Sequence, residues 1–145
     1  MYLDRRPASS ADQDFARRVH HLAYRDVVEA QFGRWDEDEQ TAYFDSTWPR
    51  HDHEIIESDG AACGYVAIEV DDDAVHVHEL VVHPEYQNQG IGTTVLSDAI
   101  ACARERDTVV ELRVLHRNRA VELYLRLGFQ EYGTTDTHRL LRLTP

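Results

Sequence analysis

The stretch Val81–Gly92, which reads VVHPEYQNQGIG, decides the fold. A run of apolar residues ends at Pro84, and a loop with the pattern Gln-x-x-Gly-x-Gly then leads into a helical repeat. Glycine lets backbone N–H groups turn inward because it has no Cβ. The start of the helix adds unpaired N–H groups and the positive end of the helix dipole. The stretch therefore predicts an anion site suited to a pyrophosphate, although a turn without a ligand can have the same spacing.

Strand-like and helical segments flank this loop in a regular order. Before it, we expect a strand, two helices and three strands at residues 2–7, 11–32, 37–48, 53–58, 63–70 and 74–83, with a capping box at 10–13. After it, we expect helices and strands at residues 90–106, 108–114, 118–127, 129–133 and 137–143. The order β-α-α-β-β-β-α-β-α-β-β indicates an α+β fold, with a mixed, mostly antiparallel sheet of about seven strands flanked by four helices.

A second stretch, Asn118–Phe129, reads NRAVELYLRLGF and follows the loop after one predicted strand. With these two motifs in this order, the chain resembles the GCN5-related N-acetyltransferase (GNAT) superfamily over nearly its whole length. The resemblance implies a single domain over residues 1–145 with acetyl-CoA as cosubstrate. It also implies direct transfer of the acetyl group to a primary amine of a small molecule or a peptide.

The resemblance further implies how acetyl-CoA is held. The pyrophosphate is expected on the loop and the first helical turn, at Gln87, Asn88, Gln89, Gly90, Ile91, Gly92 and Thr93. The pantetheine arm is expected to pair with the main chain of Leu80, Val81 and Val82, between this strand and the one that begins near Val109. Asn118 is expected to cap the next helix and to reach the cofactor arm.

Acetyl transfer to an amine needs a base that removes a proton and an acid that protonates the departing thiolate. The resemblance places the acid at Tyr124, within the second motif. The alternative for this residue is a core tyrosine whose hydroxyl group is satisfied by the protein.

The base is left open between neighbouring residues of one strand, VHVHEL at 75–80, a residue elsewhere such as His138, and no dedicated base at all. Alternation predicts His76, His78 and Leu80 on one face, and Val77, Glu79 and Val81 on the other. Histidine titrates near neutral pH, and His76-x-His78 resembles the paired histidines of the arylalkylamine branch of the superfamily. Glu79 is the rival, and only a β-bulge would place residues 78 and 79 on the same face.

The two N-terminal helices are expected to cover the acceptor mouth, as in relatives. Their aromatic residues divide into expected core (Phe44 and Trp48) and expected pocket (Tyr24 and Trp35), and His138 on the last strand joins the pocket. Such a pocket with acidic groups nearby suits a small cationic amine. A peptide N-terminus is equally compatible.

Charge and composition restrict the partners. The chain has 145 residues, 15 basic residues that are all Arg, and 27 acidic residues, for a net charge of −12. Nucleic acid and membrane surfaces are therefore not expected partners. An acidic surface without lysine is typical of halophilic proteins, and a GC-rich genome produces the same bias. With no signal-peptide pattern, we expect a cytoplasmic protein, with a homodimer as one option for assembly.

Two other functions compete with the enzyme. The first is a catalytically silent acyl-CoA-binding module of the same fold. The second is a metal-binding protein built on the histidines at 51, 53, 76, 78 and 83, although the spacing defines no tetrahedral ligand set and we expect no metal.

Overall fold

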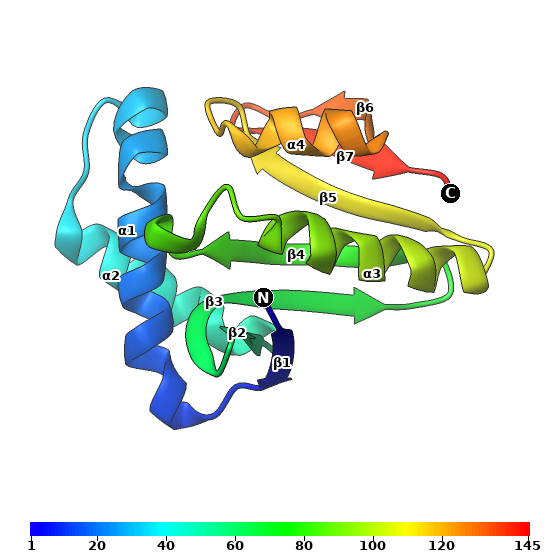
Figure 1. Ribbon diagram of the computed structural model, residues 1–145. Coiled ribbons are helices and arrows are strands. Elements are labelled where there is room, and N and C mark those ends of the chain that lie inside the picture. The colour runs from blue at the N-terminus through cyan, green and yellow to red at the C-terminus, as the bar shows by residue number, and fades with distance from the viewer.

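Strands that alternate apolar and polar residues pair into one seven-stranded sheet, in the order β1-β2-β3-β4-β5-β7-β6 (Figure 1). The computed structural model describes residues 1–145. The strands are β1 (Leu3–Pro7), β2 (Glu54–Ser58), β3 (Ala61–Val70), β4 (Ala74–Val82), β5 (Val109–Leu115), β6 (Gln130–Thr134) and β7 (His138–Leu143). All neighbouring strands are antiparallel except β4 and β5, which are parallel. The predicted mixed, mostly antiparallel α+β fold is confirmed.

The four predicted helices are also present. They are α1 (Gln13–Phe32), α2 (Glu37–Thr47), α3 (Ile91–Glu105) and α4 (Ala120–Leu127), with short 3₁₀ turns at Ser10–Asp12, Trp48–Arg50 and Pro84–Tyr86. Helix α1 ends at Gly33, whose φ of 86° suits glycine. Helix α4 begins two residues later than predicted, because the side-chain oxygen of Asn118 accepts a hydrogen bond from the Ala120 N–H at 2.9 Å and closes a turn first.

The predicted capping box at 10–13 is wrong by one residue. The backbone N–H of Ser9 donates to the carboxylate of Asp12 at 2.8 Å, so the box spans residues 9–12 and precedes a 3₁₀ turn. The guanidinium group of Arg6 also donates twice to Asp12, at 2.9 Å each. This pair holds the carboxylate over the turn, and α1 starts after it at Gln13.

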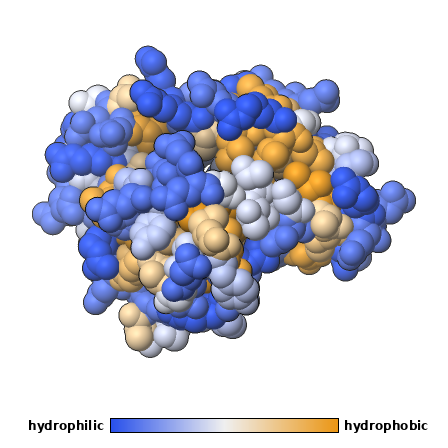
Figure 2. Space-filling view, in the orientation of Figure 1, coloured by the Kyte–Doolittle hydropathy of each residue, from blue (hydrophilic) through white to orange (hydrophobic).

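Two apolar layers cover the two faces of the sheet. On one face, α3 and α4 pack on the largest core cluster, which includes Leu96, Val110, Leu112 and Leu141. On the other face, α1 and α2 pack on a smaller cluster that includes Val19, Phe44, Tyr65 and Val81, with Trp48 against it. Phe44 and Trp48 are therefore core residues, as predicted. Apolar atoms are visible between α3 and α4, whereas hydrophilic atoms cover much of the surrounding surface (Figure 2).

The sheet is split between its two parallel strands. β4 and β5 pair only from Ala74 opposite Val109 to Val77 opposite Leu112. Each strand continues beyond that point with its other neighbour, β4 with β3 and β5 with β7. Figure 1 shows the two strands diverging toward the end of the sheet that α1 crosses. The edge of β4 that faces β5 thus has no strand partner beyond Val77.

A β-bulge on β4 changes which residues share a face. Ala67 of β3 pairs with Glu79, but the next residue, Ile68, pairs with Val77, so His78 is the extra residue. Val77 and Leu80 pack toward α3, whereas Val81 packs toward α1. The predicted alternation is therefore wrong: the residues on the α1 side of β4 are His76, His78, Glu79 and Val81.

Gly64 allows β3 to approach the end of β4 closely. A Cβ atom at this position would overlap the carbonyl oxygen of Val81 and lie 3.1 Å from the Cα of Val82. We expect Gly64→Ala to lower the free energy of unfolding by about 1–3 kcal/mol, since the backbone has to move to make room. Urea unfolding measures this. Gly92→Ala is the control, because its Cβ would meet only the side chain of Leu123 at 3.4 Å, and an equal loss in both variants would contradict the prediction.

Candidate active site

The loop between β4 and α3 presents unpaired backbone donors. Asn88 and Gly90 have positive φ angles of 63° and 84°, which turn the chain sharply before α3. No protein group accepts a hydrogen bond from the backbone N–H groups of residues 88–93. Together with the positive end of α3, these groups fit a diphosphate without any basic side chain.

Gln87 differs from the other loop residues. Its N–H donates to the carbonyl oxygen of Pro84 at 3.3 Å, and its side-chain amide donates to that of Val82 at 2.9 Å. Gln87 therefore ties the loop to the end of β4, and its backbone N–H is already used within the protein. The donors available to an anion begin at Asn88.

A cavity of about 810 Å³ opens from the split onto the α1 side of the sheet. Its wall includes the following residues predicted for the site: Tyr24, His76, His78, Glu79, Leu80, Val81, Asn118, Tyr124 and His138. Helix α1 closes one end, because the side chain of Gln31 donates to the carbonyl oxygen of Thr137 at 2.8 Å and accepts from the N–H of Arg117 at 3.0 Å. The structure therefore brings all four catalytic candidates and half of the predicted site residues around one space.

Tyr124 projects from α4 into this space. Its side chain is only 8% exposed, and its ring packs edge-on against Phe129 with centroids 5.9 Å apart. No protein group forms a hydrogen bond with its hydroxyl group, which faces the cavity rather than a partner in the core. Burial raises the pKa of Tyr124 to about 12, so the hydroxyl group keeps its proton far above neutral pH.

Glu79 faces the same cavity from β4, and a buried histidine contacts its carboxylate. Its carboxylate lies 2.6 Å from Nε2 of His53, a buried residue just before β2. The His53 ring stacks on Trp48 with centroids 3.9 Å apart, which fixes the imidazole in place. From the sequence, His53 was a candidate only for a metal site. The His51-x-His53 pattern was its one visible signal, because the pairing with Glu79 joins segments far apart in the chain.

His76 and His78 are engaged differently. Their Nε2 atoms lie 2.8 Å from Asp71 and 3.0 Å from Glu69, two carboxylates that are well exposed. The ring of His78 also stacks on His51, with centroids 3.9 Å apart. Burial and the neighbouring His78 lower the pKa of His51. Both predicted histidines thus line the cavity but already have partners.

Tyrosine and histidine rings line the α1 side of the cavity. Burial raises the pKa of Tyr24, and the nearby Tyr124 and Glu79 raise it further, so these three groups lie close to one another. The His20 ring stacks on Tyr24 with centroids 5.0 Å apart. Burial, and to a smaller extent His21, lower the pKa of His20 to about 4, so this imidazole is neutral at physiological pH.

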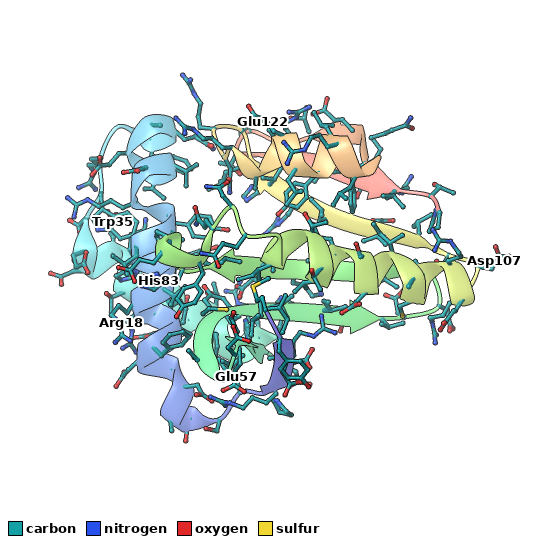
Figure 3. All side chains as sticks on the ribbon, in the orientation of Figure 1. Arg18, Trp35, Glu57, His83, Asp107 and Glu122 are labelled. Atoms are coloured by element: carbon teal, nitrogen blue, oxygen red, sulfur yellow. The ribbon has the colours of Figure 1, made fainter.

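Of the two remaining predicted pocket residues, His138 lines the cavity and Trp35 does not. His138, on β7, lines the cavity, and its Nδ1 lies 2.7 Å from the hydroxyl oxygen of Thr137. Trp35 does not line the cavity. Its indole N–H donates to Glu37 at 2.7 Å, and Figure 3 shows the residue on the outer side of α1 and α2. The turn after Gly33 carries it away from the split.

Two further features bear on alternative functions. No group of three or more His, Cys, Asp or Glu side chains is arranged to hold a metal ion. None of the helices combines the length and the apolar character that a membrane crossing requires.

Comparison with known proteins identifies the family. The family model described as "Acetyltransferase (GNAT) domain" matches residues 49–131, a span that contains β4, the loop, β5 and α4. The chain belongs to the GNAT acetyltransferase family. The match covers the residues with the unpaired N–H groups and the two strands that border the split.

Relatives of this GNAT domain include curated proteins from two organisms. An uncharacterized N-acetyltransferase of Methanocaldococcus jannaschii is 35% identical over 86 residues, which is 53% of this chain and 38% of that protein. A putative [ribosomal protein bS18]-alanine N-acetyltransferase of Bacillus subtilis is 32% identical over 82 residues, 54% of each chain. The matched part is thus about half of these relatives or less.

Solved structures share the whole architecture of this GNAT domain. The PaiA N-acetyltransferase from Thermoplasma acidophilum, solved in complex with coenzyme A, superposes with a TM-score of 0.74 over 100% of both chains. The two sequences are 16% identical, so the likeness concerns the fold.

Proposed function

We propose that this GNAT domain is an acetyl-CoA-dependent N-acetyltransferase that acetylates a primary amine of a small molecule or a peptide. One observation carries the proposal. The free backbone N–H groups of residues 88–93 lie at one end of a split in the sheet, and that split opens into a cavity that contains Glu79 and Tyr124. A donor held by its diphosphate on the loop would lie with its thioester in the split, next to an acceptor in the cavity.

Acetyl-CoA fits the residues present. Its diphosphate suits the N–H groups of residues 88–93. The unpaired edge of β4 at Leu80–Val82 offers main-chain groups to the amides of the pantetheine arm, which would take the place of a missing strand. Asn118 lies on the cavity wall at the start of α4, where its amide N–H₂ group is available to the same arm.

We assign the base to Glu79 and the acid to Tyr124. Glu79 removes a proton from the acceptor ammonium group, and the free amine attacks the thioester carbonyl carbon. The tetrahedral intermediate collapses as the C–S bond breaks, and the Tyr124 hydroxyl group donates its proton to the departing thiolate. The extra proton on the acceptor nitrogen passes through solvent to the Tyr124 phenolate, which leaves a neutral amide and restores the acid. The partners support Glu79 over His76 and His78, because buried His53 orients the Glu79 carboxylate in the cavity, whereas Asp71 and Glu69 already engage the two histidines. The products are the N-acetylated acceptor and CoA.

The acceptor belongs to the class of primary amines. The relative named as a putative [ribosomal protein bS18]-alanine N-acetyltransferase supports an N-terminal amine of a protein as one candidate. The aromatic wall formed by His20, Tyr24 and Tyr43 supports an acceptor with a cationic amine as well. The cytoplasmic location, the homodimer option and the absence of nucleic-acid and membrane partners stay predictions.

A panel of amines scored by release of the CoA thiol tests this function. An enzyme releases thiol in proportion to acetylated product, with at least one amine in the panel. A catalytically silent acyl-CoA-binding module would bind acetyl-CoA in calorimetry and release no thiol with any amine. That second result would overturn the proposal.

The loop assignment makes a separate prediction. We expect Gly92→Val to weaken acetyl-CoA binding by about tenfold or more, because a branched side chain in the first turn of α3 crowds the N–H groups that would face the diphosphate. Calorimetry measures the dissociation constant, and circular dichroism checks that the variant is folded. Ser97→Val, on the exposed surface of α3, is the control for a branched residue in this helix. Unchanged affinity in folded Gly92→Val would remove the assignment.

A further inference from the structure

We propose that Arg113 forms a subsite for the carboxylate of the acceptor. The acceptor would then be an amine that carries a carboxylate a short distance from its amino group. This inference rests on the proposed function and specifies the class of acceptor. The subsite lies on the β5 wall of the split, opposite the β4 wall that carries Glu79. It would bind the carboxylate while Glu79 receives the proton of the amine.

The position of Arg113 follows from the register of β5. Leu112 is the last residue of β5 that pairs with β4, so Arg113 is the first residue beyond the point where the sheet splits. Leu112 and Val114 pack into the core under α3 and α4. Arg113 therefore points to the opposite face, where it lines the cavity with Glu79 and Tyr124.

Arg113 has no partner within the protein. It forms no hydrogen bond and no ion pair, although the chain has 27 acidic residues. The other arginines on strands all have carboxylate partners within 4.0 Å: Arg5, Arg6, Arg139 and Arg142. Arg142, on the same face, is held by Glu111 at 3.1 Å and stacks on Tyr132 with its guanidinium carbon 4.0 Å from the ring centroid. The free planar guanidinium of Arg113 is suited to a carboxylate, which it binds through two parallel N–H donors.

Arg113 is the positive charge at its end of the cavity. Burial lowers the pKa of His138, which lines the same wall, and the charge of Arg113 lowers it further, so this imidazole stays neutral beside the guanidinium group. Glu79 lies on the other wall of the split, and no ion pair joins it to Arg113. An acceptor with an amine at one end and a carboxylate at the other matches this separation of charge.

Two sources of this chemistry are compatible with the cavity: a free amino acid, and a peptide with an acidic side chain next to its N-terminal amine. Matched pairs of acceptors distinguish them. The first arm compares glycine, β-alanine and γ-aminobutyrate with their carboxamides. The second arm compares peptides that begin Ala-Asp with peptides that begin Ala-Asn. The rate of CoA thiol release gives kcat/KM for each member of a pair.

In the wild-type protein, we expect the carboxylate member of at least one pair to be preferred about tenfold, the effect of one charged hydrogen-bonded contact. In Arg113→Gln, the ratio should fall toward 1. Arg113→Lys should keep part of the preference, because lysine retains the positive charge but lacks the two parallel N–H donors of the guanidinium group. Arg104→Gln, on exposed α3 surface, removes the same charge elsewhere and should keep the wild-type ratio. A wild-type ratio near 1 in every pair, or an unchanged ratio in Arg113→Gln, would overturn the subsite.

A binding measurement separates this subsite from the proposed function. The CoA complex is titrated with β-alanine and β-alaninamide while the ring signals of His138 are followed by NMR. The subsite predicts a larger shift with β-alanine, and the loss of that difference in Arg113→Gln. If no amine in the panel releases thiol, the proposed function fails, and this titration still decides the subsite: equal shifts with both compounds in the wild-type protein would overturn it.

Discussion

Tyr124→Phe should lower kcat by about 10²–10⁴-fold, the usual contribution of a general acid. The hydroxyl group acts on the charge that develops at sulfur in the transition state, so its loss should appear in turnover, with little change in the KM for acetyl-CoA. Phenylalanine keeps the packing of the ring against Phe129. Steady-state kinetics with the best amine of the panel, at saturating acetyl-CoA, measures the effect.

The raised pKa of Tyr124 adds a pH prediction. A pKa of about 12 means that the hydroxyl group stays protonated, and thus able to donate, at every pH below that value. Tyr124 should therefore not ionise between pH 8 and pH 10. We expect any fall in kcat over this range to be equally large in the wild type and in Tyr124→Phe. Tyr2→Phe, at an exposed position far from the cavity, controls for the loss of a hydroxyl group. Activity of Tyr124→Phe within twofold of the wild type would make Tyr124 a core residue only.

Glu79→Gln should lower kcat/KM by about 10²–10⁴-fold at neutral pH, because an amide cannot take the proton of the acceptor ammonium group. Glutamine keeps the shape of the side chain and a contact with His53. The loss should shrink as the pH approaches the pKa of the acceptor amine, about 10 for an alkylamine, since the free amine then needs no base. A residue with a purely structural role would not show this recovery.

The double variant His76→Gln/His78→Gln is the matched comparison. Both histidines line the same cavity, but Asp71 and Glu69 already engage their rings. We expect kcat/KM of the double variant to stay within about tenfold of the wild type, below the usual contribution of a general base. A large loss in the double variant together with a small one in Glu79→Gln would move the base to the histidines.

Local patterns were sufficient for most of the architecture. The element order and the positions of all four helices follow from apolar spacing, from capping residues such as Asp36, whose carboxylate accepts from the Glu39 N–H at 2.9 Å, and from glycines that end helices. The loop with unpaired N–H groups is also readable, because it depends on consecutive backbone groups and on the helix that follows them. Interactions between residues close in the sequence determine these features, so the sequence shows them directly.

Three features could not be predicted, because each depends on contacts between distant segments. The bulge at His78 arises from the register of β3 against β4, and strict alternation therefore separated Glu79 from His76 and His78, which share its face in the structure. The pairing of Glu79 with His53, and the freedom of Arg113, depend on which side chains the folded sheet brings together. Spacing and turn chemistry were enough to predict the fold and the loop whose backbone N–H groups are unpaired. Which ionisable groups face the cavity depends on strand register and on the split between β4 and β5, and both exist only once the whole sheet has formed.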